Sequence, residues 1–484
     1  MSLEPQLDPL TAAANMAEME PPYTGQQARV EASRCLNCFD APCITACPTG
    51  IDIPGFIKKI EHAKDEAAGR TILEANILGA SCARVCPTDV LCEGACVLNA
   101  RDEKPIEIGR LQRHATDFLY DRGIRPFSAP AEKSGKRVAL VGSGPASLGC
   151  AAELALLGHE AVVFEKSEQP GGLNTYGIAY YKMPPAVSLQ EVDLIRSLGV
   201  EFRCGVEVGK DPSLAQLREE FDAVFLGVGL GATRSLGIPG EELEGVVDAL
   251  SFIESFHAGP LHETPVGRQV VVLGCGNTAI DAVTQAKRLG AESATIVYRR
   301  TPREMSAYYF EYELAMGDGC DFAFAATPVE ILGDGAGGIR ALRCQRTRPA
   351  AGGGVETVPD SDFELPCDMV IEALGQEKQQ EWLAAILPGL ELDRAGRVIV
   401  DPASGQTTLA GVYCGGDAVN GGKEVVNAVA DGRKAARGMH SAFTGEQVTG
   451  PVQASRHGVD GEPSGSGYWE PVRVPERARV QAGL

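Results

Sequence analysis

Eight cysteines lie within one short stretch of this 484-residue chain, at spacings typical of metal-cluster ligands. They form two groups, Cys35-x2-Cys38-x4-Cys43-x3-Cys47-Pro48 and Cys82-x3-Cys86-Pro87-x4-Cys92-x3-Cys96. The first group is close to the Cys-Pro run of iron–sulfur proteins, with x4 where x2 is usual, and in such runs the fourth cysteine binds the other cluster. Zinc sites usually use two close cysteine pairs without the Cys-Pro signature, so the pattern favours two [4Fe–4S] clusters, with zinc as the alternative. Counting ligands alone would assign all eight cysteines to these clusters.

A glycine-rich loop, Gly142-Ser143-Gly144-Pro145-Ala146-Ser147, follows an apolar strand and opens a helical pattern over residues 147–157. In such a loop the first glycine permits a tight turn, the second admits a pyrophosphate, and the helix N-terminus offers N–H groups to the phosphates. The next strand ends at Glu165, whose carboxylate can accept hydrogen bonds from both ribose hydroxyls. Ser147 stands where Gly or Ala is usual and is small enough for close packing. Loop, helix and acid together predict a dinucleotide site, whereas the loop alone could be a packing turn.

A second loop of the same kind, Gly274-Cys275-Gly276-Asn277-Thr278-Ala279, also follows a strand and opens a helix. Its next strand, residues 294–298, ends in Arg299 and Arg300 instead of a carboxylate. Guanidinium groups can grip a 2′-phosphate that an acid would repel, so we expect NADP(H) to be preferred over NAD(H). The alternative is that both arginines form surface ion pairs and have no bearing on the phosphate.

A later segment completes the first dinucleotide site. Gly416 and Asp417 follow an apolar strand, 411–414, and precede a helical pattern over 425–437. This layout places Asp417 near a ribityl chain and a helix N-terminus near a flavin ring. Gly171-Gly172-Leu173 adds a turn beside the expected adenosine pocket. Together with the first loop, this segment predicts an FAD domain that is split around an inserted nicotinamide-dinucleotide domain.

Internal repeats indicate two related Rossmann-like domains. Each glycine loop is followed by an acidic, apolar and glycine-terminated strand, at 221–229 and at 367–375. The clustered cysteines lie among short helical patterns, such as 53–67 and 110–120, whereas residues 134–445 alternate β-branched runs with helical patterns. The expected fold is therefore α/β, with a helical iron–sulfur domain ahead of two nucleotide-binding domains. Its expected parts are iron–sulfur, 1–125; FAD, 126–242 and 377–445; NAD(P), 243–376; and a C-terminal tail, 446–484.

Composition narrows the class of protein further. The net charge is −21 and hydrophobic residues make up 44% of the chain, which excludes wholesale disorder and argues against nucleic acid or an anionic membrane as a partner. No secretory signal is visible and no apolar run approaches the roughly 20 residues of a membrane span, so we expect a cytoplasmic protein. The seven isolated cysteines are expected to be small buried residues. We expect residues 1–30 to be frayed at their start, and the tail to dock loosely with Tyr468 and Trp469 as anchors.

The cysteine groups, the strings SCARVCPTDVLCEGAC and PIEIGRLQRHATDF, and both dinucleotide loops resemble the N-terminal electron-input half of dihydropyrimidine dehydrogenase. The chain is most similar to the separate flavin/iron–sulfur subunits of the bacterial NAD(P)-dependent enzymes, and the small subunit of bacterial glutamate synthase is a more distant relative. The resemblance covers roughly residues 25–445. Gln112, in the string Gly109-Arg110-Leu111-Gln112, matches the pyrimidine branch, in which a glutamine ligates the second cluster. Glutamate synthase relatives tend to have an acid nearby.

The resemblance implies a ligand set that differs from the count of cysteines. It places one cluster on Cys35, Cys38, Cys43 and Cys96 and the other on Cys47, Cys86, Cys92 and Gln112. Cys82 then binds no iron, and we follow the family on this point. The implied FAD contacts are the 142–147 loop, Glu165, Leu173, Lys182 (where relatives often have Arg), Val208, Gly416, Asp417 and Val425. The implied nicotinamide-dinucleotide contacts lie in the second loop, at Gly274, Gly276, Asn277 and Thr278, and at Arg299, Arg300, Ala373 and Gly375.

These features predict an oxidoreductase that takes a hydride from NAD(P)H onto FAD and passes single electrons through two clusters to another protein. Hydride transfer requires no acid–base residue, so no catalytic residue is expected. In the family the pyrimidine site lies on an FMN-binding barrel, and no such barrel follows the FAD segment. We therefore expect an FMN-containing partner subunit that reduces uracil or thymine. The alternatives are a glutamate synthase small-subunit-like NADPH diaphorase that feeds another acceptor, and a non-catalytic regulatory protein with vestigial sites.

Overall fold

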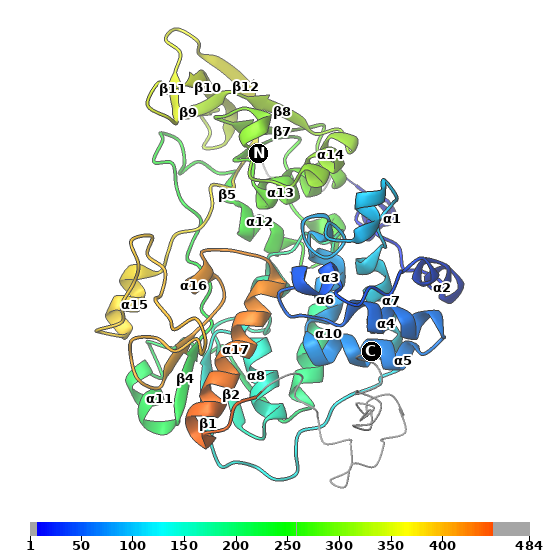
Figure 1. Ribbon diagram of the computed structural model, residues 1–484. Helices are drawn as coiled ribbons and strands as arrows, with labels where there is room; N and C mark the ends of the chain where they lie inside the picture. Colours follow the sequence, from blue (N-terminus) through cyan, green and yellow to red (C-terminus); the bar gives the residue numbers. More distant parts are fainter. Residues whose placement is uncertain (1–6, 258, 449–484) are drawn as a thin grey trace.

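The computed structural model describes residues 7–257 and 259–448, and its first quarter is helical (Figure 1). The helices are α1 (Pro9–Asn15), α2 (Gly25–Ser33), α3 (Pro42–Ala46), α4 (Ile53–Glu61), α5 (Asp65–Ala75), α6 (Gly79–Val85) and α7 (Ile108–Tyr120), with short 3-10 turns at Thr88–Val90 and Val97–Arg101. Helices α2, α4, α5 and α7 bury one shared aliphatic core that includes Ile57, Ile72 and Leu111. Several of the clustered cysteines pack against this core, so it positions the predicted cluster ligands.

A five-stranded parallel sheet in the order β14-β4-β1-β2-β3 forms the second part of the molecule. Its strands are β1 (Arg137–Val141), β2 (Glu160–Glu165), β3 (Glu201–Cys204), β4 (Ala223–Leu226) and β14 (Val412–Cys414). The helices of this part are α8 (Pro145–Leu156), α9 (Leu173–Tyr176), α10 (Pro185–Arg196), α11 (Leu214–Glu220), α15 (Gln380–Ile386), α16 (Asp417–Asn420) and α17 (Val425–Thr444). A parallel sheet that is covered on both faces needs uninterrupted apolar strands, and every residue of β4 is buried.

A second five-stranded parallel sheet has the order β5-β13-β6-β7-β8. Its strands are β5 (Val246–Asp248), β6 (Gln269–Leu273), β7 (Ser293–Tyr298), β8 (Asp321–Phe324) and β13 (Met369–Glu372). The accompanying helices are α12 (Ala249–Ser255), α13 (Asn277–Arg288) and α14 (Tyr309–Gly317), with 3-10 turns at Leu261–Glu263 and Pro302–Glu304. Because β14 and α17 return to the first sheet, the second sheet is an insertion between β4 and β14.

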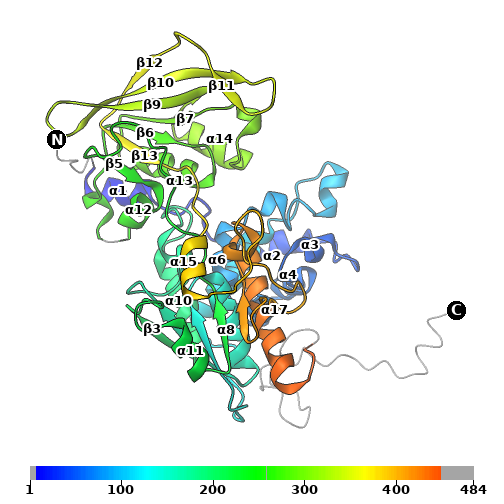
Figure 2. The same cartoon turned by 90° about the vertical axis from the view of Figure 1, so that its left-hand side faces the viewer.

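An antiparallel sheet extends the inserted part. It contains β9 (Ala326–Gly333), β10 (Ile339–Pro349), β11 (Val355–Thr357) and β12 (Phe363–Pro366), with β10 pairing to the other three. Figures 1 and 2 show this sheet at the top of the molecule, above the second parallel sheet, while the first parallel sheet lies at the bottom and the cysteine-bearing helices beside it. No helix in the described part of the chain combines the length and apolar character of a membrane span.

Glycines bring helices α8 and α17 of the first sheet region into backbone contact. A Cβ atom at Gly432 of α17 would lie 1.9 Å from the carbonyl oxygen of Ala146 in α8. Similarly, a Cβ atom at Gly149 of α8 would lie 2.8 Å from the carbonyl oxygen of Val429. This close approach places the start of α17 beside the start of α8, where the first glycine loop lies.

The structure confirms the predicted fold class and alters several local expectations. The helix expected over 53–67 is wrong in extent, because Ala63 adopts a left-handed conformation, with φ of 57°, and separates α4 from α5. The start of the chain, residues 1–6, where fraying is expected, lies outside the described residues. Asp8 caps α1 and Thr24 caps α2, and α1 packs with the core of the inserted part rather than with the cysteine-bearing helices.

Two further expectations have mixed outcomes. Six of the seven isolated cysteines are buried, and Cys204 in β3 is partly exposed. Tyr468 and Trp469, the expected anchors of the tail, lie outside the described residues. The antiparallel sheet was not expected from the sequence.

Candidate functional site

Four of the clustered thiols surround one small apolar cavity. Cys35, Cys38, Cys43 and Cys96 line it, together with aliphatic side chains such as Ile53, Ile57 and Leu98. Burial raises the pKa of Cys35, and burial followed by the charge of Cys35 raises that of Cys43 to about 11. These thiols would therefore deprotonate only with a cationic metal group beside them. The set is the one that the family resemblance assigns to the first cluster, and its donors fit a [4Fe–4S] group.

Cys47, Cys82, Cys86 and Cys92 form a second group of thiols whose charges interact. A hydrogen bond with the Cys82 thiol is the first cause of the raised pKa of Cys86, and burial and the charges of Cys82, Cys92 and Cys47 add to it. Burial is the main cause of the raised pKa of Cys92, with Glu93 and Cys47 adding to it. Cys47, Cys86 and Cys92 are thus close enough for their charges to interact.

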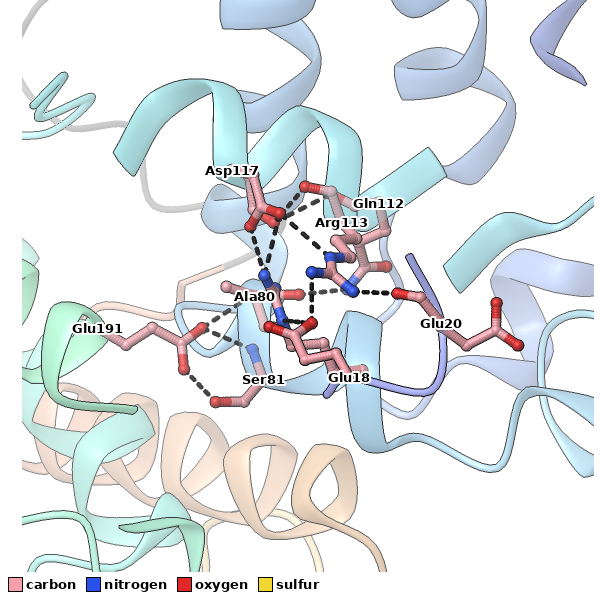
Figure 3. Close-up of polar contacts among 11 residues, drawn as sticks. Glu18, Glu20, Ala80, Ser81, Gln112, Arg113, Asp117 and Glu191 are labelled. Carbon is pink, nitrogen blue, oxygen red and sulfur yellow. Dashed lines mark hydrogen bonds and ion pairs between the residues drawn. The ribbon is translucent and has the colours of Figure 1, made fainter. Parts of the chain in front are cut away.

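Gln112 and Cys82 lie on the facing helices α7 and α6. The buried Gln112 amide donates a hydrogen bond through Nε2 to the carbonyl oxygen of Gly79, at 2.7 Å, and Figure 3 shows it pointing toward α6. This bond leaves the side-chain oxygen Oε1 as the atom of Gln112 that could bind iron. Cys82 is also buried, one helical turn after Gly79. The choice of Gln112 over Cys82 therefore stays a prediction.

The first glycine loop has the shape of a phosphate cradle. Gly142 has φ of 84°, and a Cβ atom there would lie 2.6 Å from the carbonyl oxygen of Gly227. At Gly144, by contrast, a Cβ atom would meet nothing nearer than 4.0 Å, which leaves space for a ligand. Pro145 then begins α8, so the free N–H groups of the helix start face that space. Ser147 packs closely on Gly227, as its small size predicts.

Glu165 lies where the sequence places the ribose-binding acid. Its buried carboxylate accepts hydrogen bonds from the Ser143 N–H and Oγ–H, at 2.8 and 2.6 Å, and from the Ser167 N–H at 2.8 Å. Gly172 closes over the loop, because a Cβ atom there would lie 2.8 Å from the Cα of Gly144. Leu173 begins α9 directly after Gly172. The loop, the acid and the glycine turn are therefore adjacent.

The predicted FAD contacts of the 416–425 segment begin beside the first glycine loop, although they lie far from it in the sequence. A Cβ atom at Gly416 would lie 3.0 Å from the Cβ of Ala146 in the first loop. Asp417 is half-buried, and this burial raises its pKa; its carboxylate accepts a hydrogen bond from the Lys423 N–H at 3.2 Å. Val425 opens α17 after the N-cap Glu424. Val208 is buried in the core on the other face of the sheet.

Lys182, the remaining predicted FAD contact, lies in an interdomain ion-pair cluster. Its ammonium group lies 2.6 Å from Asp281 and 2.8 Å from Glu311, and both carboxylates belong to the inserted part. Burial is the first cause of the pKa of Glu311 being raised to about 7, against the opposing effect of Lys182. The role of Lys182 at FAD stays a prediction, since its ion pairs with Asp281 and Glu311 account for its positive charge without a cofactor.

The second glycine loop brings together the predicted nicotinamide-dinucleotide contacts. Gly274 has φ of 121°, and a Cβ atom there would lie 2.3 Å from the carbonyl oxygen of Ala373. Gly375 follows two residues later with φ of 80°. Asn277 and Thr278 open α13, and the Asn277 side chain accepts a hydrogen bond from the Tyr308 N–H at 3.0 Å. The second glycine loop and the turn that ends at Gly375 therefore lie at the same end of the second sheet, where β6 and β13 end.

Arg299 and Arg300 follow β7 directly, at this same end of the second sheet. Hydrogen bonds from Thr301, and then the charge of Arg300, lower the pKa of the nearby Glu304, but no acidic oxygen lies within 4.0 Å of either arginine guanidinium among the described residues. Arg299 is exposed, and the Nε of Arg300 is buried without a hydrogen-bond partner. The surface ion pairs that would explain these arginines without a phosphate are thus not found among the described residues.

The structure adds residues that sequence reasoning missed. Tyr308 donates its hydroxyl hydrogen to Glu424 at 2.6 Å, and its N–H bonds to Asn277. Its pKa is raised, first by burial and then by Glu424, with Cys86 near enough to contribute. No spacing rule links Tyr308 to a glycine loop or to a cysteine group, so only the folded chain reveals this junction.

Two family models cover most of the chain. Residues 12–124 match a 4Fe–4S cluster domain described as dihydropyrimidine dehydrogenase domain II. Residues 136–432 match pyridine nucleotide-disulphide oxidoreductases. The expected cofactor classes, FAD, a nicotinamide dinucleotide and 4Fe–4S clusters, are those of this combination of families.

Relatives of different activity are about equally similar to the chain. The NADPH glutamate synthase small chain of Escherichia coli (strain K12) is 36% identical over 87% of this chain and 93% of its own length. The NAD-dependent dihydropyrimidine dehydrogenase subunit PreT of Salmonella typhimurium is 34% identical over 87% of this chain and 96% of its own. The expectation that the glutamate synthase subunit is the more distant relative is therefore not supported.

Solved structures share the arrangement of the two dinucleotide-type domains. Mycobacterium tuberculosis FprA in complex with NADPH superposes with a TM-score of 0.50 at 21% identity, covering 65% of this chain and 87% of its own. Thioredoxin reductase of T. acidophilum has a TM-score of 0.50 at 20% identity, covering 63% and 97%. The chain belongs to the pyridine nucleotide-disulphide oxidoreductase family and carries, ahead of that module, a 4Fe–4S domain of the dihydropyrimidine dehydrogenase type.

Proposed function

We propose that this chain takes a hydride from NADPH onto FAD and passes the electrons singly, through two [4Fe–4S] clusters, to an FMN-containing partner subunit. One observation carries the proposal: Tyr308 joins the predicted dinucleotide and flavin segments. It contacts Asn277 of the second glycine loop and Glu424 at the start of α17. The predicted hydride donor and flavin positions are thus adjacent, and the charge of Cys86 reaches the same hydroxyl.

The residues of each site would perform distinct tasks. The first loop and Glu165 would hold the FAD pyrophosphate and ribose, and the start of α17 would face the flavin. Asn277 and Thr278 would bind the NADPH pyrophosphate, and Arg299 and Arg300 its 2′-phosphate. Bound FAD accepts a hydride and releases electrons singly, as 4Fe–4S clusters require. The cysteines and Gln112 would hold those clusters at fixed positions.

The partner subunit is proposed to reduce uracil or thymine to the 5,6-dihydropyrimidine. Gln112 favours this branch, because a glutamine at that place is typical of the pyrimidine relatives. The similarity to glutamate synthase small chains supports a second candidate, in which the chain supplies electrons from NADPH to a glutamate-forming partner. Both candidates share the electron-input role and differ only in the partner.

Purification of the native complex tests the choice of partner. We expect a co-purifying FMN protein and NADPH-dependent consumption of uracil by the complex. A complex that instead forms glutamate, with no activity on uracil or thymine, would establish the second candidate. A complex that lacks both flavin and iron would contradict the electron-input role itself.

A further inference from the structure

A turn of the first sheet region inserts a lysine between two carboxylates of the inserted region. Lys182, between α9 and α10, lies 2.6 Å from Asp281 on α13 and 2.8 Å from Glu311 on α14. The three side chains are only 11%, 11% and 8% exposed. A buried charge is costly unless it is paired, so removing Lys182 would leave two buried carboxylates without a cation, and removing either carboxylate would leave only one of the two ion pairs. The cluster therefore ties α13 and α14 to the turn.

Neighbouring residues of the same turn hold one face of α13. The Tyr180 N–H donates to the side-chain oxygen of Gln285 at 2.9 Å, and the hydroxyl of the fully buried Tyr181 donates to Asp281 at 3.1 Å. The Arg288 guanidinium lies 4.3 Å from the centre of the Tyr181 ring. These two hydrogen bonds and the contact between the Arg288 guanidinium and the Tyr181 ring thus favour one orientation of α13 against the turn.

A second contact between the inserted region and the first sheet region lies at Tyr308, one helical turn before Glu311. Tyr308 occupies the N-cap position of α14. Its hydroxyl donates a hydrogen bond to Glu424, the N-cap residue of α17, at 2.6 Å. Its backbone N–H donates a hydrogen bond to the side-chain oxygen of Asn277 at 3.0 Å. Tyr308 therefore connects the start of α13 to the start of α17, which are the predicted dinucleotide and flavin segments.

We propose that Lys182, Asp281, Glu311 and Tyr308 are positioning residues, which hold the inserted domain in the orientation that presents NADPH to the flavin. This inference rests on the proposed function. None of the four needs to exchange a proton or an electron; they act through the placement of the second glycine loop. A loss of orientation slows hydride transfer while leaving the dinucleotide contacts, and so NADPH affinity, nearly intact.

Near-isosteric variants of the holoenzyme test the inference. Asp281→Asn, Glu311→Gln and Tyr308→Phe each remove one interdomain contact without replacing a predicted FAD contact. We expect normal FAD and iron content, an NADPH Kd within about twofold of wild type, and flavin bleaching by NADPH slowed about tenfold or more. Lys182→Arg should retain most of the rate that Lys182→Met loses. Lys136→Met, which breaks the more exposed Lys136–Asp222 pair inside the first domain, is the matched control and should behave as wild type.

A structural measurement separates this inference from the proposed function. Small-angle scattering and protease cleavage between β4 and β5 should show a looser domain arrangement in the Glu311 and Tyr308 variants than in the control. Unchanged bleaching rates, or lost NADPH affinity at an unchanged rate, would overturn the inference. Loss of FAD from the Lys182 variants alone would make Lys182 a flavin ligand instead. If the wild-type holoenzyme is not bleached by NADPH or NADH, the proposed function fails, and scattering and cleavage still report whether the ties hold the domains.

Discussion

Gly432 of α17 approaches Ala146 of α8 so closely that a Cβ atom at Gly432 would lie 1.9 Å from the Ala146 carbonyl oxygen. Both helices begin at predicted FAD contacts, so their separation sets the shape of that site. A backbone atom cannot move aside as a side-chain tip can, and a methyl group must push the helices apart.

We predict that Gly432→Ala lowers the free energy of unfolding by about 1–3 kcal/mol or more and reduces the bound FAD. Gly317→Ala is the matched control, since Gly317 is helical and a Cβ atom there meets nothing within 4 Å. Thermal unfolding and the ratio of flavin to protein measure both effects. Equal FAD content and equal stability in the two variants would refute the close-packing argument.

Gln112 and Cys82 are predicted to differ in their effect on the clusters. Gln112→Ala should alter the electron paramagnetic resonance signal of one reduced cluster, because it removes an iron ligand. Cys82→Ala should leave both signals unchanged. The reverse pattern would show that Cys82 completes the second cluster and that the family assignment fails here.

Arg299 and Arg300 are predicted to select NADPH over NADH. A hydrogen bond to a charged group contributes about 1.5–3 kcal/mol, so Arg300→Ala should raise the KM for NADPH about tenfold to a hundredfold and barely change that for NADH. Arg268→Ala is the control, because Arg268 precedes β6 at the opposite end of the strand from the loop. A strong preference of the wild type for NADH would contradict the assignment.

Glu191 should make stability depend on pH. It is fully buried on α10, and it accepts hydrogen bonds from the Ala80 and Ser81 N–H groups, at 2.8 and 3.1 Å, and from the Ser81 hydroxyl (Figure 3). Burial raises its pKa to about 7, above the unfolded value of about 4.3. The folded state therefore binds the extra proton, and stability falls as pH rises between these two values.

The measurement compares Tm for wild type and Glu191→Gln at about pH 5 and about pH 8. The neutral variant avoids a penalty on the order of 3 kcal/mol, so it should lose less stability than wild type at the higher pH. Other buried acids are present in both proteins and cancel. Parallel pH profiles would show that Glu191 is already ionised at low pH.

Local spacing was sufficient to predict much of the site. The glycine loops and Glu165 depend on short runs whose chemistry is set by residue type. The grouping of Cys35, Cys38 and Cys43 with the distant Cys96 came from the family resemblance and not from local spacing. Contacts between distant segments could not be predicted in this way. Lys182 meets Asp281 and Glu311, and Tyr308 meets Glu424, only because the inserted domain docks on the first. The break at Ala63 was missed because apolar periodicity continues through it.

An anaerobic titration of the purified holoenzyme with NADPH shows whether electrons pass from the dinucleotide through the flavin to the clusters. Flavin absorbance and low-temperature electron paramagnetic resonance are followed together in the same samples. The account predicts that NADPH bleaches the flavin and brings up the signals of reduced 4Fe–4S clusters, with two clusters per FAD. Flavin bleaching without any cluster signal, or a protein that contains zinc in place of iron, would contradict it.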